Sequence, residues 1–230
     1  MRLLENGTMG EHSPEDVPVS WMNQSEFVKL MEDAVKGPDA ENWYTWLELG
    51  AAYCTMGYAK LQAAYDCFER SYSLKPSAWA MYCFSIVAKI CGNLRDSAEK
   101  AMKASLMLPR DESLAKEAMA SLAAAEMYEE IDELAGKLSP ELLSVGRIRL
   151  YMIIANIKLG KLEEAEAVLM ENGGLVVADI REGENIITNI YLDLEEAKAK
   201  RDGRDFDRAA CDVPAIFDYR VSQRRKKKTV

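Results

Sequence analysis

The 230-residue sequence predicts an all-α fold of about ten helices, paired into antiparallel hairpins and closed by a capping helix at each end. Two observations predict it: the composition, and a spacing of about 34 residues that recurs along the chain. Alanine, leucine, glutamate and lysine are abundant, whereas glycine and proline number only 13 and 7. Alanine and straight-chain residues lose little freedom on entering a helix, so this composition favours helix over strand.

The recurring spacing is seen in the second helix of each expected hairpin. The residues that begin this helix are 34, 33 and 34 positions apart: Ala64, Ala98, Ile131 and Ala165. The residues four positions further on repeat the same intervals: Phe68, Met102, Ala135 and Leu169. A period of this length is typical of repeat proteins, in which each unit buries its apolar face against the next.

The first hairpin is expected over residues 42–76. Its first helix carries four residues at helical spacing on one face: Trp46, Leu49, Gly50 and Tyr53. Gly57 ends that helix, because glycine tolerates the left-handed C-cap conformation. In the second helix the small Ala64 allows the two helices to approach closely, and Pro76 stops the hairpin.

Three further hairpins are expected at residues 77–110, 111–139 and 140–172. Amphipathic helices at 24–36 and 184–202 are expected to cap the array, since an unpaired terminal hairpin would expose its inner face. The predicted solenoid therefore spans residues 21–203. A flexible leader, residues 1–20, precedes it, and an extended segment with a basic tail, residues 204–230, follows it.

The pattern W-x-x-L-G-x-x-Y, then A-x-x-x-F, then L-x-P resembles the consensus of the tetratricopeptide repeat (TPR) family. The matching residues are Trp46, Leu49, Gly50, Tyr53, Ala64, Phe68, Leu74 and Pro76. The resemblance covers about residues 42–171 and is weakest in the third repeat. It implies a right-handed superhelix whose first helices line a concave groove that binds a peptide or a partner domain.

A second resemblance concerns the end of the array. The strings ADIREGENIITNIY and DVPAIFDYR resemble the closing segment of bacterial multidomain proteins, in which a TPR array follows a sugar-related β-sandwich domain. The residues that carry it are Asp179, Ile180, Arg181, Glu182, Gly183, Glu184, Phe217, Asp218, Tyr219 and Arg220. It implies the alternative function, an accessory C-terminal helical module of a bacterial carbohydrate-active protein.

Charge and apolar patterning restrict the partners. The net charge is −9, and the run Arg224–Lys228 contributes five positive charges, so the rest of the chain carries −14. An acidic body repels phosphate backbones, so we do not expect a nucleic-acid partner, and the basic run reads as a solvated tail. No apolar run is long enough for a signal peptide or a membrane span, so we expect a cytoplasmic protein without a membrane partner.

The sequence offers little chemistry. His12 is the one histidine, which excludes a histidine-dependent triad or a multi-histidine zinc site within one chain. Acidic clusters such as Glu129–Glu133 fit the polar starts of helices, where negative charge is favourable. The five cysteines lack C-x-x-C spacing and read as small apolar residues in a reducing compartment. We expect no enzyme activity, cofactor or metal; an enzyme or nucleic-acid binder resting on the acidic clusters and basic tail is the remaining alternative.

The expected function is that of a protein-interaction scaffold with a largely apolar concave groove. By the family's register, the exposed groove positions are Tyr44, Leu47, Ala51, Thr55, Ala80, Cys83, Val87, Arg147, Leu150, Ile154 and Lys158. Because a long apolar groove does not stay wet on a monomer, something is expected to cover it. The sequence leaves four occupants open: residues 1–20, residues 212–220, a second copy of the chain in a homodimer, or a partner's peptide.

Overall fold

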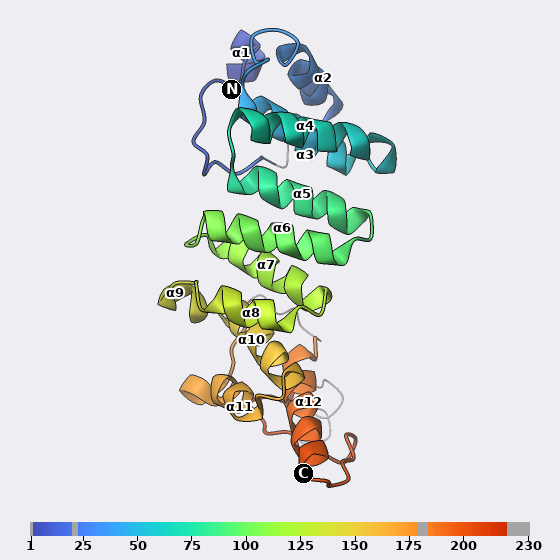
Figure 1. Cartoon of the computed structure of the whole chain (residues 1–230), viewed down its shortest axis with the longest axis vertical. Helices are drawn as coiled ribbons and strands as arrows, with labels where there is room; N and C mark the ends of the chain where they lie inside the picture. The colour runs from blue at the N-terminus through green and yellow to red at the C-terminus, as the bar shows by residue number, and fades with distance from the viewer. Residues whose placement is uncertain (1, 20–22, 179–183, 220–230) are drawn as a thin grey trace, which may run out of the picture. The chain divides into compact units, whose positions relative to one another are not determined.

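The computed structural model describes residues 2–19, 23–178 and 184–219, and these form twelve α-helices and no strand (Figure 1). The all-α prediction is therefore confirmed. None of the described helices is both long and apolar enough to cross a membrane. The basic run Arg224–Lys228 and the string Asp179–Gly183 lie outside the described residues.

The chain divides into two compact units, residues 1–125 and 126–230. The boundary falls inside the hairpin predicted at 111–139. The helices of unit 1 are α1 (Arg2–Asn6), α2 (Ser25–Ala34), α3 (Trp43–Thr55), α4 (Leu61–Leu74), α5 (Ala78–Ile90), α6 (Leu94–Met107) and α7 (Glu112–Ala124). Within unit 1, α3 packs on α4 and α5 on α6, which are the helix pairs of the hairpins predicted at 42–76 and 77–110. Helix α6 also packs on α7, across the boundary between two predicted hairpins.

Unit 2 contains five helices: α8 (Tyr128–Ala135), α9 (Pro140–Leu143), α10 (Gly146–Lys158), α11 (Leu162–Met170) and α12 (Ile186–Arg201). Helix α10 packs on α8 and α11, and α12 packs on both α10 and α11. Short 3₁₀ turns η2 (Tyr58–Lys60) and η3 (Glu171–Gly173) precede α4 and follow α11.

Side-chain caps fix where the helices of unit 1 begin. The Asn42 side chain accepts hydrogen bonds from the main-chain N–H groups of Tyr44 and Thr45 at the start of α3. Ser77 caps α5 and Asp111 caps α7 in the same way. Each cap satisfies a donor that the first turn of a helix leaves without an intrahelical partner.

The close packing of α3 on α4 depends on Gly50. A Cβ atom at this position would lie 2.5 Å from Cε1 of Phe68, a separation that no side chain tolerates. Phe68 is completely buried, as is Ala64 on the same helix. The small residue on one helix and the aromatic ring on the other therefore set the distance between the two helices. Trp46, from the same predicted stripe, is only half-buried, and its indole N–H donates to the Ala40 carbonyl.

The C-terminal segment of unit 2 packs on α12 through Phe217. This ring is completely buried and stacks on Tyr191, with centroids 5.5 Å apart. The Thr188 hydroxyl donates to the Phe217 carbonyl at 2.6 Å and accepts from the Tyr219 N–H at 3.0 Å. Residues 213–219 therefore complete the core of unit 2.

Candidate functional site

Residues 8–19, here called the docked segment, lie against the first helices of two successive hairpins, α3 and α5. Figure 1 shows this stretch passing beside α3 toward α5. Its start is anchored by the buried carboxylate of Asp39, which accepts from the Met9 N–H at 2.7 Å and from the Thr8 hydroxyl. The same carboxylate accepts from the Thr45 hydroxyl at 2.7 Å, which ties the segment to the first turn of α3.

Three side chains of α3 and α5, here called the clamp, hold the main chain of the docked segment. The Trp79 indole N–H donates to the Glu15 carbonyl at 3.1 Å. The Tyr44 hydroxyl donates to the Val17 carbonyl at 2.8 Å. The Glu48 carboxylate accepts from the Val19 N–H at 2.7 Å.

The three contacted positions alternate along the docked segment. Glu15 belongs to the turn over Ser13–Asp16, whereas Val17 and Val19 follow it. In an extended chain every second residue points its polar main-chain groups to the same side, so Val17 and Val19 can both face the clamp. The clamp therefore holds the carbonyl of a turn residue and the main chain of the two valines after it. None of its three bonds depends on which side chain the segment carries.

A stacked ring adds one side-chain contact. The His12 ring lies parallel to Tyr44, with centroids 3.7 Å apart and an interplanar angle of 9°. Nδ1 of His12 is 2.9 Å from a carboxylate oxygen of Asp16, which also accepts from the Ser13 N–H. These contacts stabilise the turn at Pro14–Glu15 that leads into the extended part.

The clamp lies in a desolvated environment. Glu48 is 1% exposed, and burial raises the pKa of its carboxyl to about 7, although the bond from the Val19 N–H opposes that shift. Burial, followed by the nearby Glu48 charge, also raises the pKa of Tyr44 above its usual range. Tyr44 is therefore a neutral donor at every physiological pH, whereas Glu48 changes charge near neutrality.

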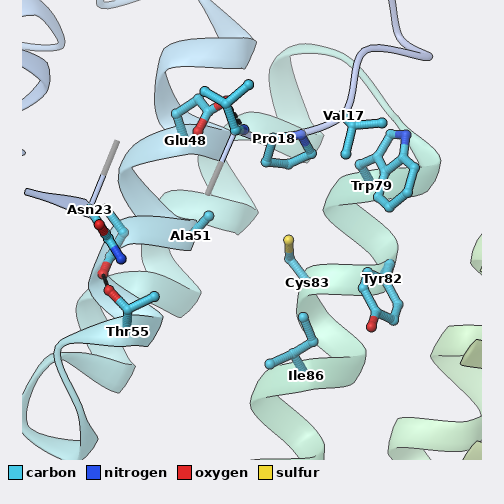
Figure 2. Close-up of a pocket in the computed structure, with 12 residues that line it drawn as sticks. Val17, Pro18, Asn23, Glu48, Ala51, Thr55, Trp79, Tyr82, Cys83 and Ile86 are labelled. Carbon is cyan, nitrogen blue, oxygen red and sulfur yellow. Dashed lines mark hydrogen bonds between the residues drawn. The ribbon is translucent and has the colours of Figure 1, made fainter. Parts of the chain in front are cut away.

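A cavity of about 270 Å³ lies between the docked segment and the clamp helices (Figure 2). Its lining is mainly apolar: Val17, Pro18, Val19, Ala51, Ala52, Trp79, Tyr82, Cys83 and Ile86, with Asn23, Glu48 and Thr55 as the polar members. Figure 2 shows Val17 beside Trp79, with Pro18 between Val17 and Glu48. Among the described residues, the docked segment thus leaves apolar space unfilled along the face it covers.

The predicted groove residues of unit 1 lie at different depths. Ala51, Thr55 and Cys83 line the cavity, and Tyr44 belongs to the clamp. The others are not exposed: Leu47, Ala80 and Val87 are buried in the core of unit 1. That core also contains residues of α1, α2 and the docked segment. These elements cover helix positions that would be at the surface if the repeat helices were alone.

The predicted groove residues of unit 2 are also divided. Leu150 is completely buried, and Arg147 is half-buried. Ile154 and Lys158 line a shallow depression between α10 and α12, together with Ile190. These four residues belong to unit 2, whereas the other predicted groove residues belong to unit 1.

Two clamp residues, Glu48 and Trp79, are absent from the predicted groove. The sequence does indicate a special role for Glu48, because a carboxylate between Leu47 and Leu49 in an apolar helix needs a hydrogen-bonding partner if it is buried. It does not do so for Trp79, since a tryptophan at this spacing fits a core position equally well.

Burial raises the pKa of the Cys54 thiol to about 11 and that of Cys67 to about 12, so neither is a nucleophile at neutral pH. Within residues 2–19, 23–178 and 184–219, no three His, Cys, Asp or Glu side chains are grouped so that they could hold a metal ion.

Comparison with known proteins finds no family model that matches the chain and no curated protein that matches it significantly. The resemblance to the TPR family therefore stays a prediction.

Proposed function

We propose that the chain is a TPR-like interaction protein that binds an extended peptide of a partner protein on the face formed by α3 and α5. The observation that supports this most directly is the clamp, which bonds only to main-chain groups: the carbonyl of Glu15 in the turn, and the carbonyl of Val17 and the N–H of Val19 after it. A surface that forms hydrogen bonds only to main-chain groups can bind peptides of different sequences, provided that they lie extended on it.

The surrounding surface suits the same ligand. The cavity beside the clamp is lined mainly by apolar side chains, which provide specificity for the peptide's own side chains. The clamp donors and acceptor are fixed on helices, so little order is lost when a peptide binds. The finer family geometry, a right-handed superhelix with a concave groove, is part of this proposal.

A peptide-display selection on the full-length chain tests the proposed function. Peptides recovered from a random library would then be measured by fluorescence anisotropy against Val19→Pro and the double variant Val19→Pro/Tyr44→Phe, because in the wild type the loss of the Tyr44 hydroxyl weakens the docked segment as well as the peptide. Loss of one hydrogen bond, about 1 kcal/mol, weakens binding roughly fivefold. Tyr58→Phe is the matched control, since Tyr58 is exposed and donates to the Ile90 carbonyl, away from the clamp.

Two results would contradict the proposal. One is a selection that returns no peptide with millimolar or better affinity. The other is a set of peptides whose binding is the same in Val19→Pro/Tyr44→Phe as in Val19→Pro, because they would then occupy a different surface.

A further inference from the structure

We infer that the docked segment is a built-in competitor for the peptide site, and that the partner peptide that replaces it carries a bulkier apolar residue than Val17. This inference rests on the proposed function and adds its regulation and the chemistry of its ligand. Three observations support it. The clamp is bonded to the docked segment, an apolar cavity lies beside the segment, and the segment is covalently part of the same chain.

The docked segment saturates the clamp. The Trp79 N–H, the Tyr44 hydroxyl and the Glu48 carboxylate are all bonded to residues of the same chain. A peptide in solution cannot form these bonds until the segment leaves. Because the segment is tethered, it competes at an effective concentration of about a millimolar, which lowers the apparent affinity of any free peptide.

The docked segment is also an incomplete ligand. The cavity beside it is bounded by Val17 and Trp79, and the Val17 side chain remains about half exposed. An additional methylene buried there strengthens binding about fourfold. A partner peptide with leucine in place of Val17, followed by the same proline, would keep every clamp bond and fill part of the cavity.

The proline at this position suits the extended conformation. Pro18 has no N–H, and the clamp requires none from it, since its bonds fall on Glu15, Val17 and Val19. A proline also restricts the preceding residue to the extended region, which reduces the entropy lost on binding. The ligand class is therefore an extended peptide with an apolar residue, a proline and a further residue that donates its N–H.

The test uses the full-length chain and two synthetic dodecapeptides. One has the sequence of residues 8–19, TMGEHSPEDVPV, and the other carries leucine at the position of Val17. The protein variant Val19→Pro removes the N–H that Glu48 accepts from the docked segment but leaves the clamp unchanged. Glu15→Gln is the matched control, since the Glu15 side chain is exposed and only its carbonyl is used.

Val19→Pro is expected to bind both peptides at least about tenfold more tightly than the wild type, because the competitor has lost a bond to a carboxylate. Glu15→Gln is expected to match the wild type. The leucine peptide is expected to bind about fourfold more tightly than the native-sequence peptide. Far-ultraviolet circular dichroism and hydrogen exchange of residues 8–19 show that Val19→Pro is folded and that its segment is released.

The failures can be told apart. Equal affinity in Val19→Pro and wild type, with the segment released, would overturn the competitor role while the proposed function stands. Equal affinity of the two peptides would overturn the assignment of the cavity to the residue at Val17. If the segment is released and neither peptide binds up to millimolar concentration, both the inference and the proposed function fail.

Discussion

The carboxylate of Glu48 accepts a hydrogen bond from the main-chain N–H of Val19, twenty-nine residues earlier, at 2.7 Å. Glu48 is almost fully buried between Leu47 and Leu49 on α3. This bond joins a helix of the first hairpin to a segment that contributes few apolar residues to the core. It also places an ionisable group where its charge affects stability.

Glu48 makes the stability of unit 1 depend on pH. Its pKa is about 7 in the folded protein, against an ordinary value of 4.5. Between these values the folded protein keeps a proton that the unfolded chain has released, so the free energy of unfolding falls as pH rises from 4.5 to 7. The full effect is roughly 3 kcal/mol.

The isosteric variant Glu48→Gln is expected to lose this contribution while it keeps an acceptor for the Val19 N–H. Urea unfolding at pH 4.5 and pH 8, followed by tryptophan fluorescence, measures it, since all four tryptophans lie in residues 21–79 of unit 1. Glu69→Gln, at an exposed position on α4, is the control. A wild-type pH dependence retained in Glu48→Gln would show that other groups produce it.

Gly50→Ala is expected to destabilise unit 1 by about 1–3 kcal/mol, because its Cβ would lie 2.5 Å from Phe68. Alanine favours helix over glycine by about 1 kcal/mol, so the net loss reports the steric conflict after that gain. Gly37→Ala is the control, since the nearest atom to its added Cβ is 3.6 Å away. Thermal unfolding at least as high in Gly50→Ala as in the wild type would refute close contact between α3 and α4.

Thr188→Val removes both hydrogen bonds that hold the C-terminal segment on α12. The Phe217 carbonyl and the Tyr219 N–H lose a partner, at a cost of about 1–3 kcal/mol for each group that stays buried. Hydrogen exchange followed by mass spectrometry is expected to show faster exchange in residues 206–219. Thr55→Val in unit 1 is the control and is expected to leave that exchange unchanged. Unchanged exchange in Thr188→Val would show that Phe217 alone holds the segment.

The cysteines are expected to differ in reactivity. Cys91 is exposed, whereas Cys67 and Cys83 are buried, and burial raises the pKa of both thiols. Brief alkylation with iodoacetamide at pH 8, followed by peptide mapping, should therefore modify Cys91 first among the cysteines of unit 1. Equal modification of Cys91 and Cys83 would show that α5 opens faster than the reaction proceeds.

The helices could be predicted because their signals are local and periodic. The sequence points to Ala64 as the small residue at the contact of α3 with α4, and Ala64 is completely buried. The contact of Gly50 with Phe68 was not singled out, although both residues belong to the repeat pattern. The burial of Leu47, Ala80 and Val87 could not be predicted in the same way. Val87 lies beside Leu61 and Tyr65 of the preceding helix α4, and the core that holds all three residues also includes Leu3 and Met9 from outside the repeats. The register of one helix does not contain these neighbours.

The sequence predicts a flexible leader over residues 1–20 and also leaves this segment open as one of four occupants of the groove. In the structure it is bonded through Gly10, Glu15, Val17 and Val19. Main-chain groups are the same in every residue, so a contact made through them leaves no pattern of residue types. The side chains on the helices that make these bonds can be noticed in the sequence. Glu48 is the clearest of them, because it is a charged residue within an apolar helix.

Proteases, like the clamp, take hold of their substrates as extended main chain. While residues 15–19 lie on α3 and α5, the carbonyls of Glu15 and Val17 and the N–H of Val19 are engaged, and a protease cannot draw this stretch into its own cleft. Expulsion of the segment by another peptide exposes a cleavable stretch of main chain. Cleavage within residues 11–19 would therefore indicate that a peptide had displaced the docked segment. In a cell, cleavage would make the displacement irreversible.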